Sequence, residues 1–142
     1  MKNLPKDKKI IVFDGECMLC NNYVKFIAKH DSKDCFRFIS IQNNNILKQI
    51  TAKKNITINN ESISLINDDD SVKIKSAAMI YILSQLNFPY RLLVIINVFP
   101  KVLLDFIYDF IAKRRYDIFG KVEHCSVIYS SEMKNIKQKI LE

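Results

Sequence analysis

Residues 10–20 read IIVFDGECMLC. Four apolar, mostly β-branched residues open this stretch, as expected of a buried strand. The pair Asp14-Gly15 is a turn signal, and from Met18 onward apolar residues recur at helical spacing. Cys17 and Cys20 are therefore expected where a strand turns into a helix.

The same periodicities predict the order of elements as far as Leu86. The predicted elements are a strand at 10–13, a helix from 18, a strand at 36–41, a helix at 44–54, strands at 62–66 and 71–75, and a helix at 76–86 with Ser76 as its N-cap. The first strand, helix and strand predict a right-handed parallel crossover, and polar residues 67–70 fit a hairpin loop. This βαβ-α-ββ-α order is that of the thioredoxin fold, so an α/β, thioredoxin-like core is expected over residues 10–88.

Residues 89–142 exceed that fold and predict a mainly helical C-terminal extension. From 92 to 112 the chain is almost wholly apolar, and polar residues recur every fourth position from Asn97 to Lys113. This spacing gives a helix one narrow polar stripe. Pro100 is expected to begin a new helix, because its missing N–H costs nothing in the first turn.

The end of the chain is predicted with fewer signals. Gly120 fits a helix stop, and a short strand or extended tail at 125–129 and a last helix at 131–141 are expected after it. No linker separates these segments from the core, so the whole chain, 1–142, is expected to form a single domain.

The apolar surface of the extension has to be buried against something. A membrane-spanning helix is disfavoured, because Pro100 and three charged residues lie inside the apolar run. Packing on the sheet-containing domain is the expected solution. A protein partner, a second copy of the chain or peripheral contact with a membrane surface are the alternatives.

Composition and charge exclude several functional classes. The chain of 142 residues is 49% hydrophobic and 26% charged, as is ordinary for a folded protein. Its net charge of +7 comes from scattered lysines with no nucleic-acid-binding motif, so no specific nucleic-acid partner is expected. The sequence begins without an apolar segment of signal-peptide length, and a cytoplasmic location is therefore expected, where stable structural disulfides are rare.

The two cysteines Cys17 and Cys20 predict redox chemistry. Unpaired backbone N–H groups and the helix dipole favour an anion at a helix N-terminus. Cys17 is therefore expected to have a lowered thiol pKa and to act as the nucleophile. Cys20, one turn later, is close enough to form a disulfide and is the expected resolving thiol. A Cys-x-x-Cys pair at such a turn indicates a thiol-disulfide oxidoreductase, and the alternative is two buried structural cysteines.

Asp14 is the third candidate site residue, and two roles are open to it. As a turn former it needs no further explanation. Its carboxylate, three residues before Cys17, could also accept or relay a proton as the dithiol cycles. That second role requires a raised pKa, since a negative charge beside the pair would oppose thiolate formation.

Metal binding is a weaker alternative. Cys35 is isolated and His124-Cys125 are adjacent, whereas structural zinc sites present a second spaced pair of ligands. No metal or cofactor is therefore expected. Cys125 is read as an ordinary packed cysteine, or as a third redox thiol if the C-terminal tail folds back over the first pair.

The sequence resembles the DCC family of predicted thiol-disulfide oxidoreductases, whose Asp-Cys-Cys motif is matched by Asp14, Cys17 and Cys20. Further similarity, within residues 10–125, lies at Ile11–Gln42, Lys75–Ala78, Tyr108-Asp109, Arg115-Tyr116, Phe119-Gly120 and Cys125. The resemblance implies a thioredoxin-like fold. It also implies dithiol–disulfide exchange with a thiol or disulfide substrate and a separate electron donor.

One departure from better-known thioredoxin-like enzymes concerns substrate docking. Those enzymes carry a cis-proline just before the third strand, facing the active cysteines, whereas residues 59–63 contain no proline. Ser62 is the candidate for that place. The alternative function is a non-catalytic interaction module that uses the apolar C-terminal helices, with the cysteines structural.

Overall fold

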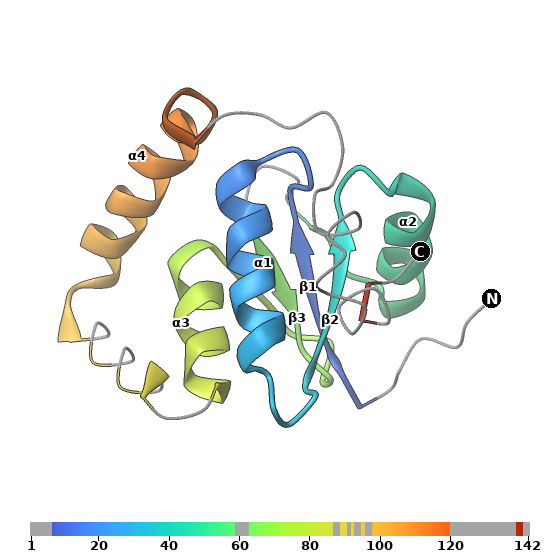
Figure 1. Ribbon diagram of the computed structural model, residues 1–142. Coiled ribbons are helices and arrows are strands. Elements are labelled where there is room, and N and C mark those ends of the chain that lie inside the picture. The colour runs from blue at the N-terminus through green and yellow to red at the C-terminus, as the bar shows by residue number, and fades with distance from the viewer. Residues whose placement is uncertain are drawn as a thin grey trace.

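The computed structural model describes residues 7–58, 63–86, 89–90, 92, 95, 98–119 and 139–140. Over these residues the chain forms a four-stranded sheet with helices on both faces (Figure 1). The elements are β1 (Lys9–Phe13), α1 (Met18–His30), β2 (Phe36–Ser40), α2 (Asn44–Lys54), β3 (Ser64–Ile66), β4 (Val72–Ile74), α3 (Lys75–Gln85) and α4 (Lys101–Phe119). Every strand and helix predicted as far as Leu86 is present, in the predicted order.

The sheet has the strand order β2-β1-β3-β4. β1 and β2 are parallel, with Lys9 opposite Phe36 and Phe13 opposite Ser40, as the predicted crossover requires. β3 runs antiparallel to β1, and β4 antiparallel to β3. This topology confirms the thioredoxin-like fold.

β1 lies at the centre of the core because helices cover both faces of the sheet. Ile11 and Phe13 pack with α1 and α3, whereas Ile10 and Val12 pack with α2 on the opposite face. All four side chains are at most 1% exposed. A continuous apolar run is the pattern expected of such a strand, since successive residues of a strand point to opposite faces.

The start of α3 differs from its prediction. The helix begins at Lys75 with Ile74 as N-cap, so the assignment of Ser76 as N-cap is wrong. The Ser76 hydroxyl instead donates a hydrogen bond to the carboxylate of Asp105 in α4. Lys75 has a left-handed backbone (φ 53°), and its ammonium group pairs with Asp109 of α4 at 3.0 Å. Contacts with α4, rather than a local cap, therefore hold this helix start.

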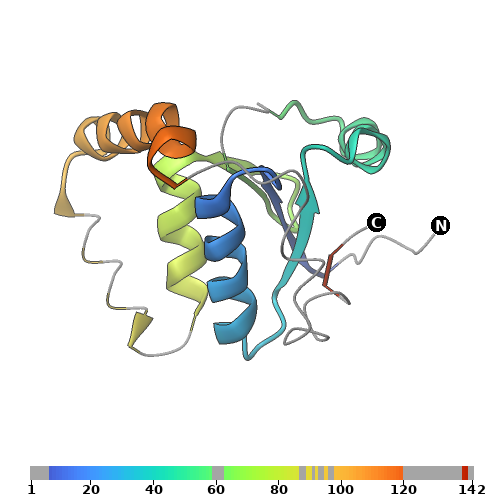
Figure 2. The same ribbon diagram turned by 45° about the horizontal axis from the view of Figure 1, so that its top comes forward.

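α4 confirms the predicted helix after Pro100 and ends at Phe119, next to the predicted stop at Gly120. The carbonyl oxygen of Pro100 accepts a hydrogen bond from the Leu104 N–H at 3.2 Å. The helix lies against α3 and reaches the first turn of α1 (Figure 2). No helix among the described residues is both long enough and apolar enough to cross a membrane.

The described end of the chain, Lys139 and Ile140, lies along β2. Ile140 forms a parallel bridge with Phe38, whose N–H donates to the Lys139 carbonyl at 2.9 Å. The Lys139 ammonium also pairs at 3.0 Å with Asp31, whose side chain is only 1% exposed. The predicted last helix is therefore wrong at these two residues, because the open edge of β2 and the buried carboxylate bind them. Residues 131–138, and the strand predicted at 125–129, lie outside the described residues.

Candidate active site

The Cys17–Cys20 pair lies just beyond the carboxyl end of β1, as predicted. Cys17 is the N-cap of α1 with an extended backbone, and its carbonyl oxygen accepts the Asn21 N–H at 3.0 Å. Cys20 is in the first turn of the helix. The two cysteines are not joined by a disulfide in this structure. The spacing from N-cap to first turn brings two cysteine side chains within disulfide reach.

The two cysteines differ in exposure. Cys17 has no exposed surface, whereas Cys20 is partly exposed and forms part of the wall of a cavity. Cys17 has the position that favours a thiolate, since the first N–H groups of a helix have no partner within it. In this conformation, however, Cys20 is the cysteine that a ligand in the cavity would contact.

Asp14 closes the turn between β1 and α1. Its Oδ1 accepts hydrogen bonds from the Glu16 N–H at 3.0 Å and from Nε2 of Gln42 at 2.7 Å, and the residue is 5% exposed. Gln42 also accepts the Gly15 N–H through Oε1 at 2.9 Å. The structure thus shows Asp14 in the turn-forming role, and the proton relay stays a prediction. Gln42 was not predicted, because it reaches the turn only through the parallel pairing of β1 with β2.

Asn21 is a second site residue that the sequence did not single out. Its side chain is fully buried, and Nδ2 donates to the carbonyl oxygens of Gly15 at 2.7 Å and Cys17 at 3.0 Å. These bonds tie the turn before the pair to the first turn of α1. The sequence did contain one sign of this role, because Asn21 lies three residues before Val24 and so on the face that α1 buries.

The structure brings together sequence segments that are far apart in the chain. The Tyr108 hydroxyl accepts the Ile63 N–H at 3.0 Å, and Asp109 pairs with Lys75. These contacts place α4 beside the end of the sheet that carries the cysteines (Figure 2). The sequence spacing does not predict these two contacts, because each joins residues more than thirty positions apart.

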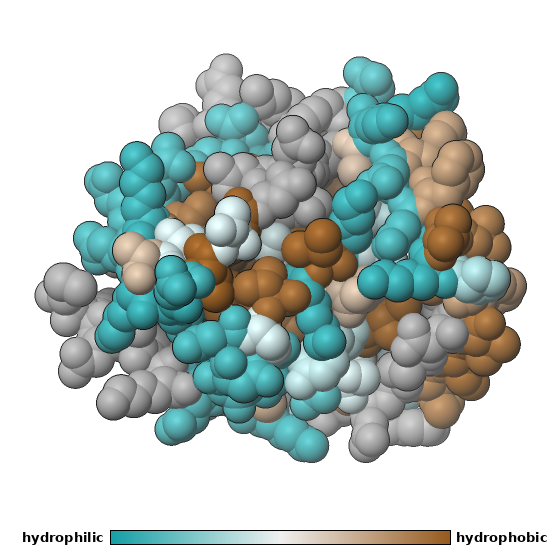
Figure 3. Space-filling view, turned by 180° about the vertical axis from the view of Figure 1, so that it is seen from behind, coloured by the Kyte–Doolittle hydropathy of each residue, from teal (hydrophilic) through white to brown (hydrophobic). Residues whose placement is uncertain are grey.

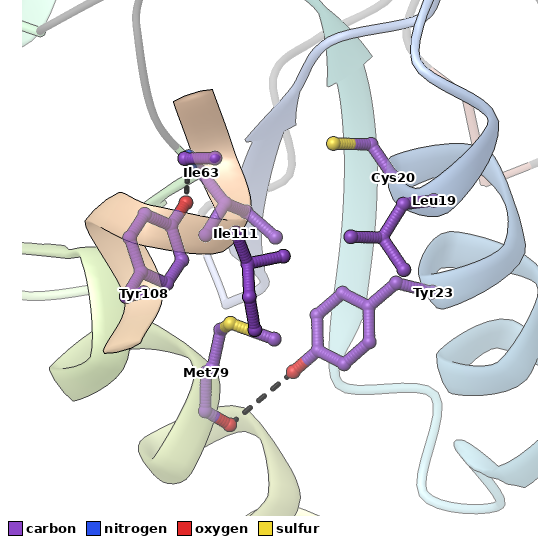
Figure 4. Close-up of a pocket in the computed structure, with 8 residues that line it drawn as sticks. Leu19, Cys20, Tyr23, Ile63, Met79, Tyr108 and Ile111 are labelled. Atoms are coloured by element: carbon purple, nitrogen blue, oxygen red, sulfur yellow. Dashed lines mark hydrogen bonds between the residues drawn. The ribbon is translucent and has the colours of Figure 1, made fainter. Parts of the chain in front are cut away.

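An apolar cavity of about 250 Å³ lies beside Cys20 (Figure 4). It is lined by Leu19, Cys20 and Tyr23 of α1, Ile63, Met79 of α3, and Tyr108, Ile111 and Ala112 of α4. The Tyr23 hydroxyl donates to the Met79 carbonyl at 3.2 Å. Burial, and to a smaller extent the neighbouring Tyr108, raises the pKa of Tyr23 above its usual range. Its hydroxyl therefore stays neutral while cysteine thiols titrate.

The other candidate ligands do not join this site among the described residues. Cys35 lies at the opposite end of the sheet from the pair, where its carbonyl accepts the Lys9 N–H at 2.9 Å. The part of the chain that the structure describes contains no group of three or more His, Cys, Asp or Glu side chains that could hold a metal ion. Ser62, His124 and Cys125 lie outside that part.

Comparison with known proteins finds one matching family and two similar proteins. The model of the DCC1-like thiol-disulfide oxidoreductase family matches residues 11–121. The uncharacterized protein YuxK of Bacillus subtilis is 35% identical over 117 residues, which cover 82% of this chain and 85% of that protein. The chloroplastic DCC family protein At1g52590 of Arabidopsis thaliana is 32% identical over 124 residues, or 86% of this chain and 72% of that protein. No solved structure shows a significant match.

Proposed function

Because this chain belongs to the DCC1-like thiol-disulfide oxidoreductase family, we propose that it carries out dithiol–disulfide exchange through Cys17 and Cys20. The observation that carries the proposal is the position of the pair. Two cysteines that are not joined by a disulfide lie at the N-cap and in the first turn of α1, held by a hydrogen-bonded turn at the end of a buried strand. An N-cap position favours a thiolate, and a cysteine one turn later is within disulfide reach, which supports the proposal.

The exchange balances as two successive displacements. In the first, the Cys17 thiolate attacks one sulfur of a substrate disulfide, so that a mixed disulfide forms and one substrate thiolate leaves. In the second, the Cys20 thiolate attacks the Cys17 sulfur, closes the Cys17–Cys20 disulfide and releases the other substrate thiolate. Two electrons pass from the protein to the substrate, and a dithiol donor restores the reduced pair by the reverse steps.

The roles within the pair are part of the proposal. The N-cap position of Cys17 supports its assignment as the attacking thiolate, and Cys20 is then the resolving thiol. The complete burial of Cys17 is the observation that opposes this order. For Cys17 to attack, the substrate has to displace some of the protein groups that bury the Cys17 side chain. We further propose that Asp14, held in the turn before the pair, exchanges a proton with the dithiol as it cycles.

A redox titration of the intact protein tests this function. Across glutathione buffers, counting of alkylated thiols by mass spectrometry is expected to show a reversible change of two thiols, mapped by peptide analysis to Cys17 and Cys20. The midpoint potential then indicates whether the protein serves as a reductant or an oxidant. If both thiols stay reduced and unreactive across the whole range, the proposal is wrong and the cysteines are structural.

The outer surface of α4 supports a second candidate function. The middle of its polar stripe faces α3, where Asp105 binds Ser76 and Asp109 binds Lys75. Several of its apolar side chains face outward, with Val102 83% and Phe106 68% exposed. Figure 3 shows the resulting apolar surface along one side of the molecule. Soluble proteins rarely expose an apolar patch of this kind, and where they do, it marks an interaction site.

Charge indicates which partner suits that surface. Two of the three acidic residues of α4 are paired with side chains of α3, and Asp117 is the third, exposed one. Lys101, Lys113 and Arg114 are also exposed. An apolar stripe bordered by basic residues binds the surface of an anionic membrane. We therefore propose peripheral attachment to such a surface as the second function.

Sedimentation with vesicles tests this attachment. The protein is expected to bind vesicles that contain phosphatidylserine and to bind neutral phosphatidylcholine vesicles much more weakly, because each basic residue near an anionic surface contributes about 1 kcal/mol. The double variant Val102→Ser, Phe106→Ser is expected to bind at least about tenfold more weakly. The protein could instead fail to sediment with either kind of vesicle and form a concentration-dependent dimer that this variant abolishes. In that case the surface is a self-association interface and the membrane proposal is wrong.

A further inference from the structure

We propose that the apolar cavity beside Cys20 is a substrate subsite, which takes an aromatic or large aliphatic group next to the disulfide of the substrate. This inference rests on the proposed exchange function and names the class of substrate that the pair would serve. Four observations carry it: the place of the thiol, the chemistry of the walls, the volume and the occupied backbone edge.

The cavity has a redox residue in its wall. Leu19 and Cys20 come from the first turn of α1, two and three residues after Cys17. In Figure 4 the Cys20 side chain lies at one end of the group of lining residues, with Ile111 of α4 across from Leu19 and Tyr23. A group seated in this space therefore lies next to the Cys20 thiol, so that the disulfide attached to it is held close to the pair.

The walls select an apolar group. No charged side chain lines the cavity among the described residues. The two hydroxyls in its walls are both engaged within the protein, since Tyr23 donates to the Met79 carbonyl and Tyr108 accepts the Ile63 N–H. Binding in such a space comes from burial of apolar surface rather than from polar contacts.

The size of the cavity suits one large side chain. An engineered apolar cavity of about 150 Å³ in another protein accepts benzene, and this one measures about 250 Å³. A phenylalanine-sized or leucine-sized group therefore fits. A longer polar chain would gain nothing from walls that offer it no partner.

The familiar docking edge is already occupied at Ile63. In better-known thioredoxin-like enzymes, substrates dock on the backbone just before the third strand. Here the N–H of Ile63, the residue before β3, donates to the Tyr108 hydroxyl of α4. α4 thus uses this backbone donor and supplies Tyr108, Ile111 and Ala112 as cavity walls. Because α4 occupies this part of the docking edge and builds the cavity beside it, we expect the substrate to be recognised through the apolar cavity.

The test compares two substrate peptides that differ only in the residue before their single cysteine. That residue is phenylalanine in one peptide and serine in the other, and each peptide is supplied as a mixed disulfide with glutathione. The reduced protein is expected to react with the phenylalanine peptide about 10- to 100-fold faster, which is the range expected for burial of one aromatic side chain. Stopped-flow or quenched assays with thiol counting give the second-order rate constants.

Two variants examine the cavity itself. Ala112→Phe fills it, and Leu19→Gln makes its wall polar at nearly constant size; each is expected to reduce the preference to within about threefold. Ala52→Phe adds the same side chain on the exposed surface of α2 and is expected to keep the preference. Equal rates for the two peptides with the wild-type protein, or an unchanged preference in both cavity variants, would overturn the subsite while leaving the exchange function intact. If the protein reacts with neither peptide nor with a small-molecule disulfide, the exchange function fails first.

Discussion

Replacing either Cys17 or Cys20 with serine is expected to abolish the reversible exchange of two thiols. The reason is that both displacements need a thiolate, and a serine hydroxyl neither ionises near neutral pH nor forms a disulfide. The measurement is turnover of a disulfide substrate with dithiothreitol as donor, together with thiol counting in glutathione buffers. Retained turnover in both single variants would contradict the central proposal.

Cys35→Ser is the matched control for these variants. Cys35 likewise forms no disulfide and is partly exposed, but it lies at the opposite end of the sheet from the pair. Its replacement is expected to leave turnover unchanged. A loss comparable to that of the pair would show that the assay reports general stability rather than the chemistry of Cys17 and Cys20.

The same variants assign the order of attack. With Cys17 as the nucleophile, Cys20→Ser is expected to accumulate a stable mixed disulfide on Cys17, because the resolving thiol is missing. A mixed disulfide that forms only on Cys20, in the Cys17→Ser variant, would reverse the two roles. That result would agree with the greater exposure of Cys20 and would leave exchange by the pair in place.

Asn21→Leu is expected to lower the free energy of unfolding by about 1–3 kcal/mol, the cost of leaving a buried polar group without its partner. Leucine has the same branched skeleton of four heavy atoms as asparagine, but it cannot donate to the carbonyls of Gly15 and Cys17. Because these bonds hold the turn that positions Cys17, the exchange rate is also expected to fall by about 10- to 100-fold. Urea unfolding and the turnover assay measure the two effects.

Asn22→Leu is the matched control, since Asn22 is the next residue of α1 and is exposed. It is expected to change stability by less than about 0.5 kcal/mol and to leave the exchange rate unaltered. If Asn21→Leu unfolds at the same urea concentration as the wild type and exchanges as fast, the hydrogen bonds to Gly15 and Cys17 do not support the site.

Local pattern accounts for the parts of the fold that were predicted correctly. The run Ile10–Phe13 reads as a strand covered on both faces, and Ile10 and Ile11 do pack on opposite sides of the sheet. The helical period from Met18 places Cys17 at a helix start, where it is found. These features depend on which face of a strand or helix is apolar, and spacing along the chain carries that information.

Apart from Asn21, whose partners are local, the features that sequence reasoning missed depend on contacts between residues far apart in the chain. Gln42 reaches the turn at Asp14 because β1 and β2 pair in parallel. Ser76 faces an acceptor in α4 and so does not cap α3, and Lys139 pairs with Asp31 across more than one hundred positions. No local period encodes such partners.

α4 shows most clearly the difference between what local sequence pattern predicts and what tertiary contacts decide. The polar positions at every fourth residue correctly predicted a helix with one polar stripe, which includes Asp105 and Asp109. Such a stripe usually faces solvent along its whole length, whereas here its middle residues, Asp105 and Asp109, face α3 and bind Ser76 and Lys75. The element order, the helix start at the cysteines and the existence of α4 thus follow from the sequence, because each depends on residues that are neighbours along the chain. The cavity beside Cys20 and the exposed apolar side of α4 follow from tertiary pairing, because polar groups far apart in the chain set the direction in which α4 faces.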